Sequence, residues 1–468
     1  MTILESRPSS RRPQAPPQAR YDAGRSRRED LPLEAHAELV MDGRPDPLAI
    51  LAAQDTTRVK DLVPIRYGRM SRSPFTFLRG AAAVMASDLA STPTTDLGVE
   101  LCGDAHLGNF RTYRAPSREL VFDLNDFDET LPGPFEWDVK RLATSITVAG
   151  RNNGFSTEKT RAATREAMRS YRIAMGEAAG LNPLDLSYYR FDATRVLERM
   201  QTRGKKHAKR ARKRLGKAQR KDSLRALRKY TDVVDGRRVI VPDPPVIVPV
   251  PPEHGMDAPD GVVALFDRYV ETLPLDRQAV IGRFTPIDVA QKVVGVGSVG
   301  TRCLILLLEA GDGTPLFLQF KQAVSSVLEA HLEPSPYEQA GRRVVEGQRL
   351  IQATSDLFLG WARYESASAP AVDFYFRQLW DGKGKSDPEL MTPPWLTAFS
   401  DLCGKTLAYA HARSGDPMMI HGYIDDPDGG FEDAMVAFAD RYADLTDADH
   451  ATMAHAIEDG RLEVIRDT

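Results

Sequence analysis

The chain has 468 residues, 42% hydrophobic and 27% charged, with a net charge of −3. This composition is ordinary for a globular protein of two or three packed units, and so small a net charge identifies no partner. The three cysteines are far apart and form no CxxC pair, which excludes a zinc knuckle and suits a reducing compartment better than a disulfide framework. The absence of a long apolar run or an apolar leader predicts a cytoplasmic protein with no membrane partner.

The first 200 residues divide into a tail and a longer helical region. Residues 1–29 are rich in Pro, Arg, Ser and Gln and poor in apolar side chains, so we expect a disordered tail. Residues 30–200 should form a helical lobe that also contains short strands. Within it, the alanine-rich segment 77–90 predicts one packed helix, and WDVKRLATSITVAG at 137–150 predicts another.

Two polar motifs in this lobe follow predicted strands. The strand GVELCG leads into GDAHLGNF at residues 103–110, and the strand ELVFDL leads into an acidic cluster. Carboxylates so close together are costly without a cation, which favours a metal site, although Asp and Asn are also common in turns and caps. The candidate catalytic carboxylate is Asp104. The candidate metal ligands are Asn109, Asp123, Asp126 and Asp128.

Residues 201–260 contain a basic segment and a proline-rich connector. Residues 203–229 carry many Lys and Arg side chains that suit nucleic-acid phosphates, but no aromatic residues interleave for base stacking. Nucleic acid is therefore a possible but less favoured partner than a small ligand. The following VIVPDPPVIVPVPP excludes a helix and a central strand and indicates an extended connector.

Residues 261–392 predict a β-rich lobe, and residues 393–468 predict helices that pack on the helical lobe. The segment VGVGSVGTR lies between two apolar strands, where its glycines permit backbone amides to approach phosphates. The candidate nucleotide contacts in this loop are Gly295, Gly297, Ser298 and Gly300. Lys321 follows in the next strand, LFLQFKQA, and needs a buried partner. Glu346 on the expected helix 337–353 is preferred to Glu338 for that role, since Val344 and Val345 flank it.

The joint occurrence of GDAHLGNF, FDLNDFDETLPGPFEWDVKRLA, VGVGSVGTR, LQFKQA and FYFRQLWDGKG resembles the bacterial DUF2252 family of uncharacterised proteins. The resemblance covers about residues 46–456 and implies no activity by itself.

GDAHLGN also resembles, more distantly, the HGDLHxxN catalytic loop of aminoglycoside phosphotransferases and other kinase-like enzymes. This implies that Asp104 is the catalytic aspartate, that Asn109 and Asp126 bind Mg²⁺, and that Lys321 holds ATP phosphates. FYFRQLW, which contains Gln378, would be the hinge strand beside adenine. Counting forward from Asn109 favours Asp123 as the metal ligand instead, although the Asp126 alignment has more matching residues.

Two features depart from that pattern. The glycine-rich loop follows the catalytic-type loop, so the implied α+β, protein-kinase-like two-lobed fold would be circularly permuted, with extra helices. Cys102 stands where the motif has histidine, so the loop must be anchored differently. The favoured function is an ATP- and Mg²⁺-dependent phosphotransferase acting on an unidentified hydroxyl. The alternatives are a metal-dependent phosphohydrolase or nuclease and a nucleotide- or nucleic-acid-binding pseudoenzyme.

Overall fold

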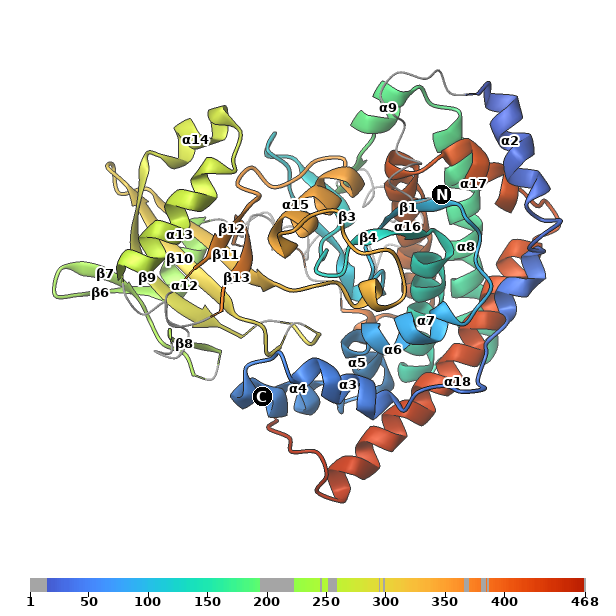
Figure 1. Ribbon diagram of the computed structural model, residues 1–468, viewed down its shortest axis with the longest axis horizontal. Coiled ribbons are helices and arrows are strands. Elements are labelled where there is room, and N and C mark those ends of the chain that lie inside the picture. Colours follow the sequence, from blue (N-terminus) through green and yellow to red (C-terminus); the bar gives the residue numbers. More distant parts are fainter. Residues whose placement is uncertain are drawn as a thin grey trace.

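The computed structural model has a mixed α and β architecture, which confirms the α+β class. A helical part and a β-rich part lie side by side (Figure 1). The structure describes residues 15–193, 223–244, 246–250, 259–293, 295–297, 299–365, 370–379, 384 and 387–466. We call residues 15–193 and 393–466 the helical part and residues 223–379 the β-rich part. Among the described residues, no helix combines the length and apolar character needed to cross a membrane.

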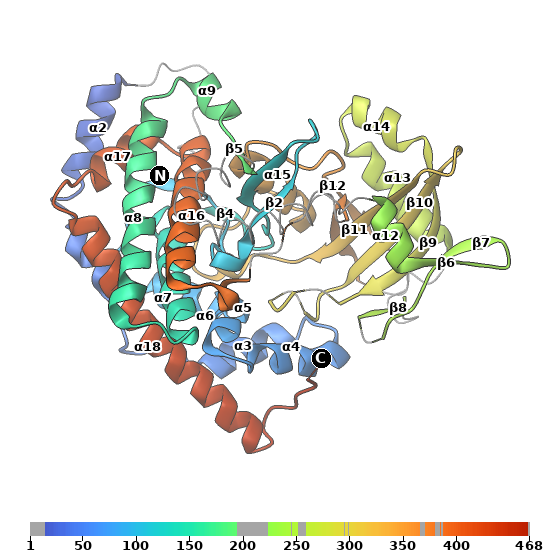
Figure 2. The same cartoon turned by 180° about the vertical axis from the view of Figure 1, so that it is seen from behind.

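Long helices form most of the helical part. Helix α16 packs along α8, and α18 runs across α7 (Figure 2). The helices are α2 Pro17–Ser26, α3 Pro47–Asp55, α4 Val63–Met70, α5 Pro74–Gly80, α6 Ala82–Ala90, α7 Glu136–Asn152, α8 Thr157–Ala179, α9 Pro183–Tyr188, α16 Pro393–Ser414, α17 Pro417–Ile424 and α18 Gly430–Glu458, with short 3-10 turns η1 Leu33–Ala37 and η2 Lys60–Leu62.

Two local predictions in this part need correction. The expected disordered tail is ordered from residue 15, because α2 packs on α17. Polar contacts hold it, including a hydrogen bond from the Tyr21 hydroxyl to Asp425 (2.8 Å), so a shortage of apolar side chains was a poor guide. Residues 1–14 lie outside the described chain. The segment 77–90 is also not one helix, since α5 ends and α6 begins around Ala81 (φ −111°, ψ 36°).

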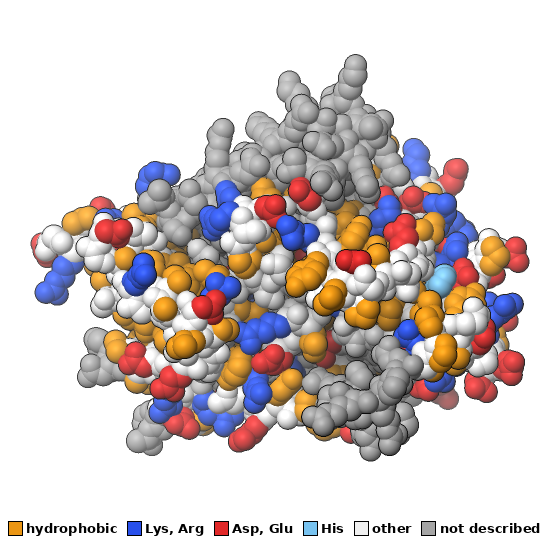
Figure 3. Space-filling model, turned by 90° about the horizontal axis from the view of Figure 1, so that it is seen from above, with side chains coloured by type: hydrophobic (Ala, Val, Ile, Leu, Met, Phe, Trp, Pro, Cys, Tyr) orange, Lys and Arg blue, Asp and Glu red, His pale blue; other side chains and the backbone are white. Residues whose placement is uncertain are grey.

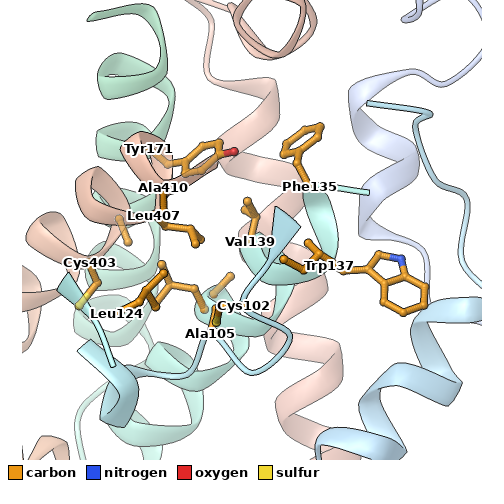
Figure 4. Packing of buried hydrophobic residues seen from close by; sticks show 14 of the residues in the cluster. Cys102, Ala105, Leu124, Phe135, Trp137, Val139, Tyr171, Cys403, Leu407 and Ala410 are labelled. Carbon is orange, nitrogen blue, oxygen red and sulfur yellow. The ribbon is translucent and has the colours of Figure 1, made fainter. Parts of the chain in front are cut away.

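Two small antiparallel sheets bring the polar motifs into the helical part. Strand β1 Gly98–Leu101 pairs with β4 Leu131–Pro134, and β2 Phe110–Arg114 forms a hairpin with β3 Leu120–Leu124, which also pairs with β5 Phe191–Asp192. The main core lies directly beneath the loop between β1 and β2. Cys102 and Ala105 from this loop join Leu124, Val139 and Leu407 there (Figure 4).

The β-rich part is built on one antiparallel sheet in the order β12-β13-β11-β10-β9-β8. Its strands are β8 Ile247–Pro249, β9 Phe284–Lys292, β10 Cys303–Ala310, β11 Pro315–Ala323, β12 Gly360–Tyr364 and β13 Val372–Gln378. Among its described residues, the proline-rich segment contributes the edge strand β8 to this sheet, as its lack of backbone donors predicts. Residues before 261 therefore belong to this sheet as well.

Side chains alternate between the two faces of this sheet. Leu304, Leu306 and Leu308 of β10 pack in the core with helix α13 Pro259–Glu271, whereas Ile305 and Leu307 join a second core with helix α12 Ser223–Tyr230. The hairpin β6 Thr231–Val234 and β7 Arg237–Ile240 and helix α14 Leu275–Ile281 complete this part. Helix α15 Ala340–Ile351 contacts β12 and β13 and also β1 and α16, so it connects the two parts.

Candidate functional site

The loop 102–109 is held by the start of α7. Asp138 accepts hydrogen bonds from the backbone amides of Cys102 (2.7 Å) and Gly103 (3.1 Å). Gly103 has φ 78°, and a Cβ there would overlap the Glu129 carbonyl, so the turn requires glycine. His411 from α16 places Nε2 3.4 Å from Asp138. The anchor of this loop is therefore an aspartate on α7, supported by a histidine that is remote in sequence.

Asp104 presents one bonded and one open carboxylate oxygen. Its Oδ1 accepts from Arg141 Nε (2.9 Å) and Nη2 (2.7 Å), while Oδ2 lies 3.6 Å from His106 Nε2 and accepts no hydrogen bond from the described residues. Burial raises the pKa of Asp104 above its ordinary value, although Arg141 acts against this shift. Oδ2 is thus placed to receive a hydrogen bond or a proton from a ligand.

His106 is a neutral orienting group in this loop. Its Nδ1 accepts from the Gly108 amide (2.9 Å), so the ring hydrogen of the neutral form is on Nε2, which faces Asp104. Burial and the nearby Arg79, Arg141 and Arg111 keep its pKa well below the usual value. The Gly108 contact gives this histidine a hydrogen-bonding role within the loop.

Asn109 is buried and is oriented by the same loop. Its Nδ2 donates to the Asp104 carbonyl (2.7 Å), which leaves the amide Oδ1 as the remaining polar atom of the side chain.

The acidic cluster divides into three environments. Asp128 is fully bonded, since its Oδ2 lies 2.5 Å from Lys321 Nζ and its Oδ1 accepts from the Tyr375 hydroxyl (2.7 Å). Asp126 lies 3.9 Å from Lys321 Nζ and is close enough to Asp104 to raise the pKa of that residue. Asp123 instead accepts from the amides of Leu124 (2.9 Å) and Ala353 (3.4 Å), and its charged neighbour is Arg413. The structure therefore brings Asp126 and Asp128 to Asp104 and Lys321, and directs Asp123 elsewhere.

Asp126 has an incomplete set of partners. Its Oδ1 is buried without a hydrogen bond, although the side chain as a whole is 38% exposed. Buried carboxylate oxygens are normally bonded or bound to a cation. In the described residues no three Asp, Glu, His or Cys side chains gather closely enough to hold a metal ion. Mg²⁺ needs only one or two carboxylates when phosphates and water complete its ligands, so Asp126 and the Asn109 amide fit that mode.

Lys321 joins the β-rich part to the acidic cluster. Burial opposes its charge, but Asp128, Tyr375 and Asp126 outweigh this effect and raise its pKa well above the ordinary value. The predicted pairing with Glu346 is wrong. Glu346 lies 3.5 Å from Arg349, its neighbour on the exposed side of α15.

The other candidate, Glu338, precedes α15 instead of lying on the helix and is 92% exposed. The buried face of α15 presents Arg343, which donates to the carbonyls of Asp128 (2.7 Å) and Thr130 (2.6 Å).

The glycine-rich loop is held by the helical part. The Gly295 carbonyl accepts from Arg69 (2.6 Å), and the Gly300 carbonyl accepts from the Val59 amide (2.8 Å). Gly300 has φ 97° and packs on the Arg58 side chain, so a larger residue is excluded there. Gly297 lies against the backbone of Arg79. Ser298, a predicted nucleotide contact, lies outside the described residues.

The backbone at the end of β13 is also hydrogen-bonded within the protein. The backbone amide of Gln378 donates to Asp356 (2.8 Å), and Leu379 donates to Phe317 (2.9 Å). The backbone N–H of Gln378 is therefore already hydrogen-bonded within the protein. The half-buried side chain of Gln378 makes no hydrogen bond with the described residues.

On the one face shown in Figure 3, the charged side chains of the described residues form no concentration comparable to that of the candidate site. In that view, basic and acidic side chains of the described residues are interspersed among apolar ones. Residues 203–222, which form most of the basic segment predicted from sequence, lie outside the described chain.

Arginines are numerous in the site, and sequence reasoning missed Arg111, Arg343 and Arg377 among them. Arg79 and Arg111 flank the catalytic-type loop, Arg141 bonds Asp104, and Arg343 and Arg377 bond the acidic loop. One usable signal was the placement of Arg343 beside Val344 and Val345 on the apolar stripe of its helix. The others carry no local pattern.

The chain belongs to a bacterial family. A family model described as "Uncharacterized protein conserved in bacteria (DUF2252)" matches residues 58–456, so the family predicted from the motifs is confirmed. No curated protein and no solved structure matches the chain.

Proposed function

We propose that this protein is an ATP- and Mg²⁺-dependent phosphotransferase with a kinase-like arrangement of two lobes whose order in the chain is exchanged. The acceptor is a hydroxyl group. One observation carries the proposal: Lys321, from the strand after the glycine-rich hairpin, lies 2.5 Å from Asp128 and 3.9 Å from Asp126. Segments about two hundred residues apart thereby form one site.

The order of elements in the β-rich part supports the same function. Kinases place a glycine-rich loop between two strands, a phosphate-binding lysine on the third strand, and a supporting helix after it. Here β9 and β10 flank the loop, Lys321 lies on β11, and α15 follows. The lysine partner differs, because Asp128 and Arg343 take over the connection that a helix glutamate makes in kinases.

Asp104 is the proposed base. The acceptor hydroxyl would donate its hydrogen bond to the open Oδ2, and its proton passes to that atom as the acceptor oxygen bonds to the γ-phosphorus. The bond from phosphorus to the bridging oxygen breaks, and its electron pair leaves with ADP. Arg141 holds Oδ1 and so fixes the direction of Oδ2.

Asn109 and Asp126 are the residues that would hold Mg²⁺, and Asp126 Oδ1, which accepts no hydrogen bond, fits this role. The bound ion supplies charge neutralisation on the phosphate oxygens. Two-metal hydrolysis is less well supported, because it needs several carboxylates around paired ions, and the described residues contain no such group.

Thermal unfolding with nucleotides tests this proposal. ATP with Mg²⁺ should raise the melting temperature of the wild-type protein, since a ligand at about 100 times its Kd adds about 2.7 kcal/mol. ATP with EDTA should give a smaller shift. In Asp126→Asn the two shifts should become equal, whereas the exposed-loop control Asp312→Asn should behave as wild type.

Absence of any shift with ATP and Mg²⁺ in the wild-type protein would exclude the proposal. If the Asp126→Asn variant retained the full Mg²⁺ dependence, residues other than Asp126 would have to bind the metal. Single-turnover release of ADP, lost in Asp104→Asn but with nucleotide binding retained, separates the proposed base from a binding residue.

A further inference from the structure

Arg79 lies between the glycine-rich loop and the catalytic-type loop. Its backbone oxygen is 3.1 Å from the position that a Cβ would take on Gly297, and its Nε is 3.4 Å from the equivalent position on Gly108. Because both of these positions are glycine, no side chain there crowds Arg79. One residue of α5 therefore contacts both loops of the candidate site.

The guanidinium of Arg79 has no bonded partner. Its Nε is buried without an acceptor, and no described residue accepts a hydrogen bond from it. Asp104, Glu389 and Asp126 lie near enough to favour its charge, but none forms an ion pair with it. Arg141 and Arg343, which are more deeply buried, each donate to two or more acceptors. A largely buried guanidinium that bonds no group is costly, so its position implies an anion that can accept the hydrogen bonds which the nearby carboxylates do not.

Arg111 brings a second positive charge to the same place. Its Nε donates to the Gly108 carbonyl (2.7 Å), and its other nitrogens donate to no described group. Burial lowers the pKa of Arg111, and Arg79 lowers it further, because the two like charges are close. Both side chains keep part of their surface exposed, so a ligand can reach them from solvent.

We propose that Arg79 and Arg111 form a phosphate-binding subsite that holds a phosphoryl group beside Asp104 and beneath the glycine-rich loop. Guanidinium groups match phosphate oxygens in geometry and charge. The identification of the phosphate with the transferred group of ATP rests on the proposed function. A phosphate carried by the acceptor is the other source of the same chemistry. In the first case the two arginines neutralise charge on the transferred group's oxygens during the step from ADP to the acceptor.

The test compares wild type, Arg79→Met, Arg79→Lys and Arg111→Met by calorimetric titration with ADP and Mg²⁺, ATP and Mg²⁺, and inorganic phosphate. The control is Arg268→Met, a half-exposed arginine paired with Glu365 on the far side of the β-rich part. ATP should bind wild type more tightly than ADP. In each Met variant the Kd for ATP should rise about tenfold or more, which is the effect expected from losing hydrogen bonds to a charged group. The Kd for ADP should change little. Arg79→Lys should recover part of the ATP affinity.

The melting temperature of the unliganded variants separates a binding role from a structural one. Because Arg79 bonds no protein group, Arg79→Met should melt at or above the wild-type temperature. A clearly lower temperature, or an unchanged preference for ATP over ADP in both Met variants, would overturn the subsite.

Phosphate binding that depends on Arg79 without any nucleotide binding would support the subsite, assign the phosphate to the acceptor, and reject the phosphotransferase proposal. Loss of neither nucleotide nor phosphate affinity in the variants would reject the subsite and leave that proposal standing.

Discussion

The two loops of the candidate site are held in opposite ways. The catalytic-type loop is bonded by its own surroundings in the helical part, chiefly Asp138 and Arg141 of α7. The glycine-rich loop belongs to the β-rich part, yet its carbonyls are bonded by Arg69 and Val59 from the helical part. The first loop is therefore held within its own part, whereas the second is held by bonds from the other part. Lys321 is one of the buried charges of the β-rich part that contact the helical part.

The largest effect is expected from Lys321→Met, which removes this buried charge. Asp128 would remain buried without its cation, and breaking a buried ion pair from one side typically costs about 3 to 5 kcal/mol of unfolding free energy. Urea unfolding measures it. The surface control Arg268→Met should cost less than about 1 kcal/mol. A loss for Lys321→Met as small as that of the control would mean that the two parts do not depend on this contact.

A smaller loss is expected from Asp138→Ala, which tests the organisation of the catalytic-type loop. Two backbone donors, at Cys102 and Gly103, would lose their acceptor, at a cost of about 2 to 4 kcal/mol. Hydrogen exchange should rise at these amides and stay unchanged in the glycine-rich loop. Asp138→Asn keeps one acceptor oxygen and should lose about half as much. Equal acceleration in both loops would show that they are not held independently.

The smallest effect is expected from Glu346→Gln, which tests the correction to the lysine partner. Its ion pair with Arg349 is partly exposed, so the loss should be about 0.5 kcal/mol or less by urea unfolding. A loss comparable with that of Lys321→Met would restore Glu346 as the partner of the lysine.

Local patterns predicted the elements better than their contacts. The strands before Asp104 and Asp126, the helix at 137–150 and the hairpin around the glycine-rich loop were all found from periodicity and turn residues. The helix 337–353 was placed correctly but began too early, at Tyr337 instead of Ala340. Strand β12 and the edge strand β8 were missed, because both are short and lack a clear alternating pattern.

Local sequence patterns could not distinguish the roles of the three aspartates in the acidic cluster. Strand β3 ends at Leu124, so the two-residue alternation that orients Asp123 does not extend to Asp126 and Asp128. The structure separates the three because Lys321 approaches from another part of the chain and selects Asp128. Counting along the motif carries no information about such a partner.

The sequence by itself determined the family and the mixed α and β composition, and it supplied the candidate site residues, because motifs and periodicity are local properties. Only the tertiary structure decided that Lys321 meets Asp128, that Arg343 and not Glu346 faces the acidic loop, and that Arg79 lies between the two loops. These contacts join segments far apart in the chain. Their geometry depends on how helix and sheet faces pack. The residues that make these contacts have no distinctive pattern within their own segments, so a single sequence does not reveal them.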